Sequence, residues 1–179
     1  MKMKTGADLR KKRGGFTLLE LVVAIAIVLL IGAAVSPILL AHLKDAKVAS
    51  LNENLVNMKA AFESWYTKEA GVIKDANNDG NYLDDMVNAG WLNREPTDPN
   101  FQFAIKKYTD TNGKVAYYID LTPQTGAEST AYEIITKLDE KIDGGNGDAD
   151  GVLQYTASNG TLTEAFYLLY KEAGMTAWH

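Results

Sequence analysis

Carboxylates and carboxamides are the side chains with which this sequence could do chemistry, since cysteine is absent and histidine occurs only as His42 and His179. The absence of cysteine excludes a thiolate nucleophile, a disulfide framework and thiolate metal sites. His42 falls at the edge of an apolar segment and His179 is terminal, so a Ser–His–Asp set has no suitable base. The adjacent Asp84 and Asp85 do not define a general acid and a general base. We therefore expect no catalytic residue and no enzymatic activity.

Two polar loops carry oxygen donors at alternate positions, which is the spacing of the first half of a calcium-binding loop. In the first loop the full calcium pattern fails, because Met86 stands where the closing glutamate belongs. An Asx-rich turn without a metal is the alternative for each loop. Calcium therefore stays open, and no cofactor is required. The candidate ligands are Asp75, Asn77, Asp79, Asn81, Asp84, Asn146, Asp148 and Asp150.

One carboxylate interrupts an otherwise apolar stretch. Glu20 is followed by Leu21–Val35, in which no side chain is polar. A charged carboxylate in the hydrocarbon core of a membrane costs about 2.5–3.5 kcal/mol on insertion scales. Residues with this cost normally have a polar partner inside protein, so Glu20 is a candidate assembly residue.

The apolar stretch is long enough to cross a bilayer. Leu21–Ala41 matches the length of about 20 helical residues that spans the hydrocarbon core. Basic side chains directly before it favour a cytoplasmic N-terminus, with the rest of the chain outside. A signal anchor, or a signal peptide cleaved near Gly32–Ala34, is the simplest alternative.

Charge is divided unequally along the chain, whose 179 residues carry a net charge of −5. Residues 1–15 contain six basic side chains and one acidic one, whereas the remainder contains 12 basic and 22 acidic ones. This division is typical of a targeting segment ahead of an acidic product. Because nucleic-acid binding needs clustered Lys and Arg, the acidic product is expected to bind no nucleic acid.

The helical pattern continues beyond the apolar stretch, as far as about Lys68. Residues 16–43 are apolar on all sides, so they must be buried in lipid or against other helices. Pro37 lacks an N–H group and is expected to kink or locally open the helix. Farther along, apolar residues recur every three or four positions and define a single face, namely Val48, Leu51, Leu55, Met58, Phe62 and Trp65.

The C-terminal half predicts an antiparallel sheet and one short helix. Alternating apolar residues around Asn-Gly turns are typical of β-hairpins. A helix is expected over Ser129–Ile142, with Ser129 or Thr130 as its cap. The predicted strands are Phe101–Tyr108, Lys114–Leu121, Val152–Thr156 and Thr161–Tyr170.

The stretch from Lys11 to Leu21 resembles the cleavage and methylation signature of bacterial type IV pilins and their pseudopilin relatives. It has a basic leader, then Gly-Phe-Thr-Leu, a glutamate five residues into the product and a long apolar helix. The resemblance covers roughly residues 10–45. It implies that a prepilin peptidase cleaves between Gly15 and Phe16 and methylates the new amine of Phe16.

The same resemblance implies that Phe16, Glu20 and Pro37 act in assembly. Glu20 would face the Phe16 ammonium group of a neighbouring subunit, and Pro37 matches the helix-breaking proline of the family. Two buried charges each cost several kcal/mol alone and much less as a pair, so this pairing would fix the register between subunits. Thr17 is expected to satisfy part of the same site.

The resemblance also implies an α+β fold, in which a long N-terminal helix, half of it transmembrane, carries an antiparallel β-sheet domain on its outer half. The expected segments are a cleaved leader over 1–15, a transmembrane and polymerisation helix over 16–43 and its amphipathic continuation over 44–70. A globular head follows over 71–179, with a loop region over 71–100 and the sheet with its short helix over 101–179. Residues 90–99 are similar to the αβ-loop of these proteins.

The function that the resemblance implies is that of a structural type IV pilus subunit. Such a subunit is anchored in the inner membrane before assembly and then polymerises with itself into an extracellular filament. The implied partners are the prepilin peptidase and an inner-membrane assembly platform with its ATPase. One alternative is a pseudopilin or minor pilin of a type II secretion or DNA-uptake machine. A more distant one is a membrane-anchored calcium-binding module.

Overall fold

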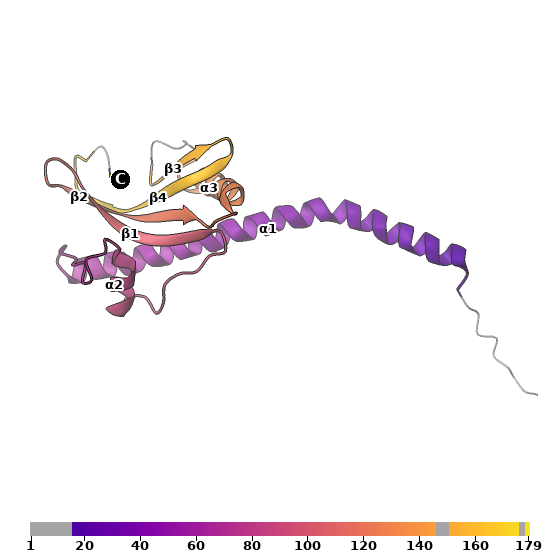
Figure 1. Ribbon diagram of the computed structural model, residues 1–179, viewed down its shortest axis with the longest axis horizontal. Helices are drawn as coiled ribbons and strands as arrows, with labels where there is room; N and C mark the ends of the chain where they lie inside the picture. Colours follow the sequence, from indigo (N-terminus) through magenta and orange to yellow (C-terminus); the bar gives the residue numbers. More distant parts are fainter. Residues whose placement is uncertain (1–15, 146–150, 176–177) are drawn as a thin grey trace, which may run out of the picture. The chain divides into compact units, whose positions relative to one another are not determined.

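The computed structural model describes residues 16–145, 151–175 and 178–179. Its elements follow the order α1 (Leu18–Lys68), α2 (Tyr82–Asn88), β1 (Phe101–Thr109), β2 (Val115–Pro123), α3 (Glu128–Ile142), β3 (Leu153–Ser158) and β4 (Thr161–Lys171) (Figure 1). The chain divides into two compact units between His42 and Leu43. A long apolar helix followed by an antiparallel sheet domain is the α+β fold that the sequence predicts.

The first unit is helical from Leu18 onward, and all its described residues are exposed. It is part of the one helix in the described chain that is long and apolar enough to cross a membrane, by length and composition. The α-helix continues through Pro37 without a local opening, and a kink at this position stays a prediction. The hydroxyl of Ser36, directly before Pro37, donates a hydrogen bond to the Gly32 carbonyl at 2.7 Å.

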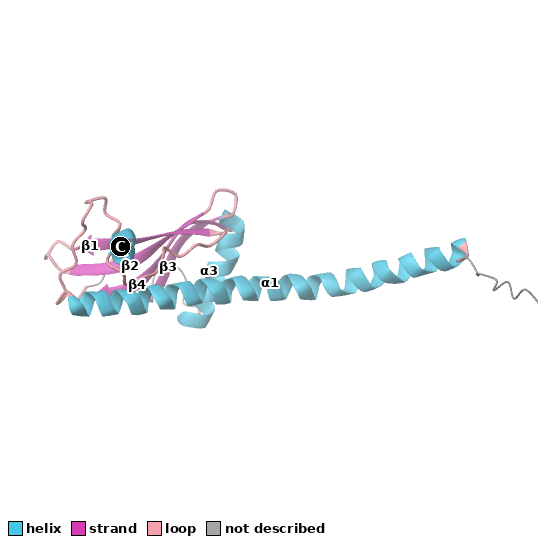
Figure 2. Cartoon of the chain, turned by 90° about the horizontal axis from the view of Figure 1, so that it is seen from below, coloured by secondary structure: helices cyan, strands magenta, loops and turns pink. Residues whose placement is uncertain are grey.

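The second unit contains a four-stranded antiparallel sheet in the order β1-β2-β4-β3. Figure 2 shows these strands beside the C-terminal half of α1. The turn between β1 and β2 is closed by Asp110, whose Oδ1 accepts backbone hydrogen bonds from Asn112 and Lys114, both at 2.8 Å. The turn between β3 and β4 places Asn159 and Gly160 at positive φ, which favours a tight hairpin. Both predicted hairpins are therefore confirmed.

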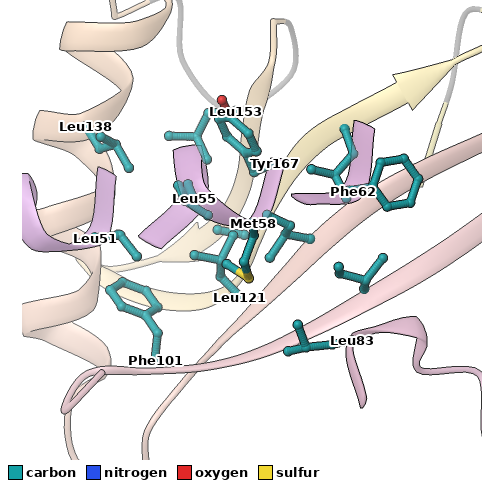
Figure 3. Packing of buried hydrophobic residues seen from close by; sticks show 14 of the residues in the cluster. Leu51, Leu55, Met58, Phe62, Leu83, Phe101, Leu121, Leu138, Leu153 and Tyr167 are labelled. Carbon is teal, nitrogen blue, oxygen red and sulfur yellow. The ribbon is translucent and has the colours of Figure 1, made fainter. Parts of the chain in front are cut away.

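The main core lies between the second half of α1, the inner face of the sheet, α2 and α3 (Figure 3). Burying one large apolar side chain contributes about 1.5–3 kcal/mol, so this layer is the main source of stability for the unit. The α1 face that the periodicity predicts is fully buried at five of its six positions, and Trp65 is 5% exposed. Its members are Val48, Leu51, Leu55, Met58, Phe62 and Trp65.

The outer face of the sheet is covered by the C-terminal segment. Trp178 is buried against Tyr118 and Phe166, and the ring of His179 stacks on Phe166 at a centroid distance of 4.2 Å. Nearby, the Lys114 ammonium donates to the Ala173 carbonyl at 2.6 Å. Burial lowers the pKa of His179, which favours the neutral form of its stacked ring, and the carboxylate of Glu164 opposes this shift.

Two local predictions are wrong. The region 71–100 is not only loop, because α2 forms within it, with Asn81 as its N-cap. Ser129 and Thr130 do not cap α3, which begins at Glu128 after Ala127. The Glu128 carboxylate instead accepts a hydrogen bond from the backbone N–H of Gly126 at 3.0 Å. An acidic side chain in the first turn therefore satisfies a backbone donor of the segment that leads into the helix.

Candidate assembly site

Thr17 and Glu20 form a reciprocal capping box at the start of α1. The Glu20 carboxylate accepts hydrogen bonds from the Thr17 backbone N–H at 2.8 Å and from the Thr17 hydroxyl at 2.9 Å. In return, the backbone N–H of Glu20 donates to the Thr17 hydroxyl at 3.2 Å. Threonine three residues before glutamate is the usual sequence pattern of this motif. Within a single chain, Glu20 therefore already has one polar partner.

The surface around this box is apolar and exposed. The Phe16 side chain is 91% exposed and that of Leu18 is 82% exposed. Every described residue from 16 to 47 is exposed, including the valines, leucines and isoleucines of the apolar stretch. Soluble monomers rarely expose a contiguous apolar surface of this extent. This half of α1 therefore needs lipid or other protein around it.

Both halves of α1 are helical, but only the second half is buried on one face by other elements of the chain. From Val48 onward the helix has a buried face against the sheet and a polar face toward solvent. Two partly exposed ion pairs lie at the start of this half, Lys44–Glu133 at 2.6 Å and Asp45–Lys137 at 3.2 Å. They tie α1 to α3, although exposed pairs of this kind contribute at most about 1 kcal/mol each.

The structure joins Thr17 and Glu20 at the start of α1 and places Pro37 farther along the same helix. Gly15 lies outside the described residues, so cleavage after it stays a prediction. The roles of Phe16, Glu20 and Pro37 in assembly also stay predictions, since they concern a second subunit.

The predicted calcium loop before α2 is organised by hydrogen bonds to its own backbone. The Asp75 carboxylate accepts the backbone N–H of Gly80 at 2.8 Å, and the Asp79 carboxylate accepts that of Asn81 at 2.7 Å. The Asn77 carboxamide donates to Asp79 at 2.9 Å and to Asp84 at 2.7 Å. These contacts are those of an Asx-rich turn.

Asn81 has a structural role that its place in the ligand pattern does not indicate. Its carboxamide oxygen accepts the backbone N–H of Leu83 at 3.1 Å, which caps α2. The same oxygen accepts the backbone N–H of Ile105 at 3.0 Å, which ties the loop to the edge strand β1. An asparagine directly before the apolar pair Tyr82–Leu83 is the signal that could have predicted this cap.

Among the described residues, no group of three or more His, Asp or Glu side chains lies close enough together to hold a metal ion. Negative charge nevertheless accumulates in this loop. Burial raises the pKa of Asp85, the carboxylates of Asp84, Asp75 and Asp79 raise it further, and the hydrogen bond from the Ala76 N–H opposes this shift. Asn146, Asp148 and Asp150, the candidate ligands in the second predicted loop, lie outside the described residues.

Comparison with protein families identifies one motif in the chain. The prokaryotic N-terminal methylation motif matches residues 10–36. This motif is the signature of type IV pilins and pseudopilins, and it contains Gly15, Phe16, Thr17 and Glu20. No curated protein and no solved structure matches the chain.

Proposed function

We propose that this chain is a structural subunit of a type IV pilus, which is cleaved after Gly15 and polymerises through its N-terminal helix into an extracellular filament. The observation that carries the proposal is the methylation motif at residues 10–36 on a helix whose apolar side chains are exposed on all sides. A filament of identical helices covers such a surface, and repetition of one head-to-tail contact produces an open helical assembly. The role is structural rather than enzymatic.

Before assembly, residues 16–43 lie in the inner membrane, with the N-terminus in the cytoplasm. Lipid tails are as apolar as leucine, so moving this helix from lipid into a bundle of helices brings no hydrophobic gain. Extraction therefore needs work, which an assembly platform and its ATPase would supply. The prepilin peptidase would first expose the Phe16 amine.

The charge of Glu20 supplies the register of the bundle. In the bundle its carboxylate would pair with the Phe16 ammonium group of a neighbouring subunit, and a subunit docked in the wrong register would leave both charges unpaired. The capping box with Thr17 explains how the single chain tolerates this carboxylate beforehand, because two hydrogen-bond donors already satisfy it.

A pseudopilin or minor pilin of a type II secretion or DNA-uptake machine is the second candidate. The methylation motif supports it equally, since pilins and pseudopilins share that signature. Abundance separates the two candidates, because a major pilin dominates the fibres sheared from cells. A membrane-anchored calcium-binding module is the more distant alternative, and it would keep its binding activity after deletion of residues 1–43.

The experiment that tests the proposal is mass spectrometry of the mature chain together with gel analysis of sheared surface fibres. We expect a product that begins at N-methylated Phe16 and forms the main band of the fibres. A mature product that begins elsewhere would contradict the proposal. A correctly processed product that stays in the membrane fraction and is only a trace component of the fibres would support the second candidate.

Calcium binding by the loop that contains Asp79 is a separate proposal. A bound cation would offset the repulsion among Asp75, Asp79, Asp84 and Asp85, so we expect the melting temperature to rise by a few degrees when calcium is added to chelator-treated protein. The Asp79→Ala variant is the control, and its melting temperature should not respond. An identical melting temperature with and without calcium would contradict calcium binding by this loop.

A further inference from the structure

A polar groove runs between α1 and the chain that connects α2 with β1. Its cavity of about 330 Å³ is lined by Asn54, Asn57 and Met58 from α1 and by Leu92, Asn93, Arg94, Pro96 and Thr97 from the connection. This volume is enough for one or two side chains. The groove lies entirely within the second unit and is separate from the apolar half of α1.

The lining of the groove favours an anionic group. It offers three carboxamides, one hydroxyl and one guanidinium group as hydrogen-bond donors, and it contains no carboxylate. The neighbouring cavity on the same connection differs in this respect, because Glu95 and Asp98 line it. A groove that offers many hydrogen-bond donors and no carboxylate is unusual here, because residues 16–179 contain 12 basic and 22 acidic side chains.

Arg94 is the residue of the groove that is best suited to hold a carboxylate. It is the only arginine after Arg13 in the sequence. Its side chain is exposed and forms no ion pair or hydrogen bond with any residue that the structure describes. A guanidinium group matches a carboxylate through two parallel hydrogen bonds, which a lysine cannot form.

The matching negative surface is the loop before α2. Four aspartates fall between positions 75 and 85, and Asp79 is exposed at its tip. These carboxylates accept hydrogen bonds from backbone N–H groups and from one carboxamide. Among the described residues, none of them forms an ion pair with a basic side chain. No ion pair joins this loop to Arg94 within the described part of one chain.

We propose that the groove around Arg94 receives a carboxylate from the calcium-free Asp75–Asp85 loop of a second copy of this chain. The inference rests on the proposed function, since a filament brings heads of identical subunits together. The groove and the loop are different surfaces, so the contact is heterologous and can repeat along an open assembly. This contact between globular domains would add specificity to the apolar packing of the helices.

Cross-linking between two copies tests this contact, because the chain has no cysteine of its own. Differently tagged Arg94→Cys and Asp79→Cys chains are co-expressed, and a short thiol-specific crosslinker is added to membranes and to sheared fibres. A crosslinker is needed because an Arg–Asp pair holds the two Cα atoms farther apart than the ~7 Å that a disulfide spans. We expect a mixed dimer that carries both tags.

The matched control replaces Asp79→Cys with Thr111→Cys, which places an exposed thiol in the β1–β2 turn. A mixed dimer no stronger than this control would overturn the proposal. Charge reversal gives an independent readout. Arg94→Glu and Asp79→Arg should each lower fibre yield about fivefold, and the double variant should restore it, since a lost surface ion pair is worth up to about 1 kcal/mol. Normal yield from both single variants would also contradict the contact.

These outcomes separate the inference from the proposed function. Fibres that form normally without the mixed dimer refute only the contact of the heads. A mixed dimer in membranes, from a chain that never forms fibres, supports the contact and refutes the pilus subunit.

Discussion

Replacing Glu20 with alanine should leave the chain stable in the membrane and lower the yield of sheared fibres by more than about tenfold. In the membrane the variant loses a carboxylate that costs about 2.5–3.5 kcal/mol there, so insertion does not suffer. In the filament it leaves the Phe16 ammonium group buried without its partner, which costs about 3–5 kcal/mol, and every 1.4 kcal/mol is a factor of ten. Quantitative blotting of the membrane and fibre fractions measures both effects.

Glu20→Gln is the control that separates charge from capping. Glutamine can keep the reciprocal box with Thr17, because its carboxamide oxygen also accepts the two hydrogen bonds seen at 2.8 and 2.9 Å. It lacks the negative charge that would pair with Phe16. We expect this variant to fail in fibre formation like the alanine variant. If Glu20→Gln formed normal fibres and Glu20→Ala did not, fibre formation would depend on the capping box and not on the ion pair between subunits.

Replacing Phe62 with alanine should destabilise the head by about 3–5 kcal/mol. Phe62 is fully buried in the second half of α1, and its ring lies 5.2 Å from the ring of Tyr117 and 5.8 Å from that of Tyr66. The surrounding aromatic rings cannot collapse fully into the space left by the missing ring. Since a domain is usually stable by 5–15 kcal/mol, the variant should lose a large part of its stability.

The measurement is denaturant unfolding of the mature chain in detergent, followed by the fluorescence of its tryptophans, Trp65, Trp91 and Trp178. Val56→Ala is the matched control, because Val56 is on the same helix but is 50% exposed, and its loss should cost at most about 0.5 kcal/mol. Similar unfolding midpoints for the two variants would contradict the assignment of residues 48–65 to the core of the head.

The regions that the sequence predicts correctly are those whose signal is local. The spacing of Val48 to Trp65 places six side chains on one helix face, whatever covers them, and the Asn-Gly turns define the two hairpins. The methylation motif lies in one continuous stretch and needs no tertiary contact to be identified.

The features that the sequence does not predict arise where distant residues decide the local structure. Asn81 matches a ligand pattern, yet its oxygen is used by Leu83 and by Ile105, which lies 24 positions away. That contact with β1 helps to fix α2, a helix of seven residues that is too short to be stable alone.

By itself the sequence determines a long helix with an apolar half and an amphipathic half, a processing signature at its start and two hairpins after it. These follow from periodicity, charge and turn residues, all of which act over a few positions. Only the tertiary structure decides the strand order β1-β2-β4-β3, the packing of Trp178 over the outer face of the sheet and the groove without carboxylates beside Arg94. Each of these depends on which residues far apart in the chain pack against one another and exclude water. No short stretch of sequence contains that information.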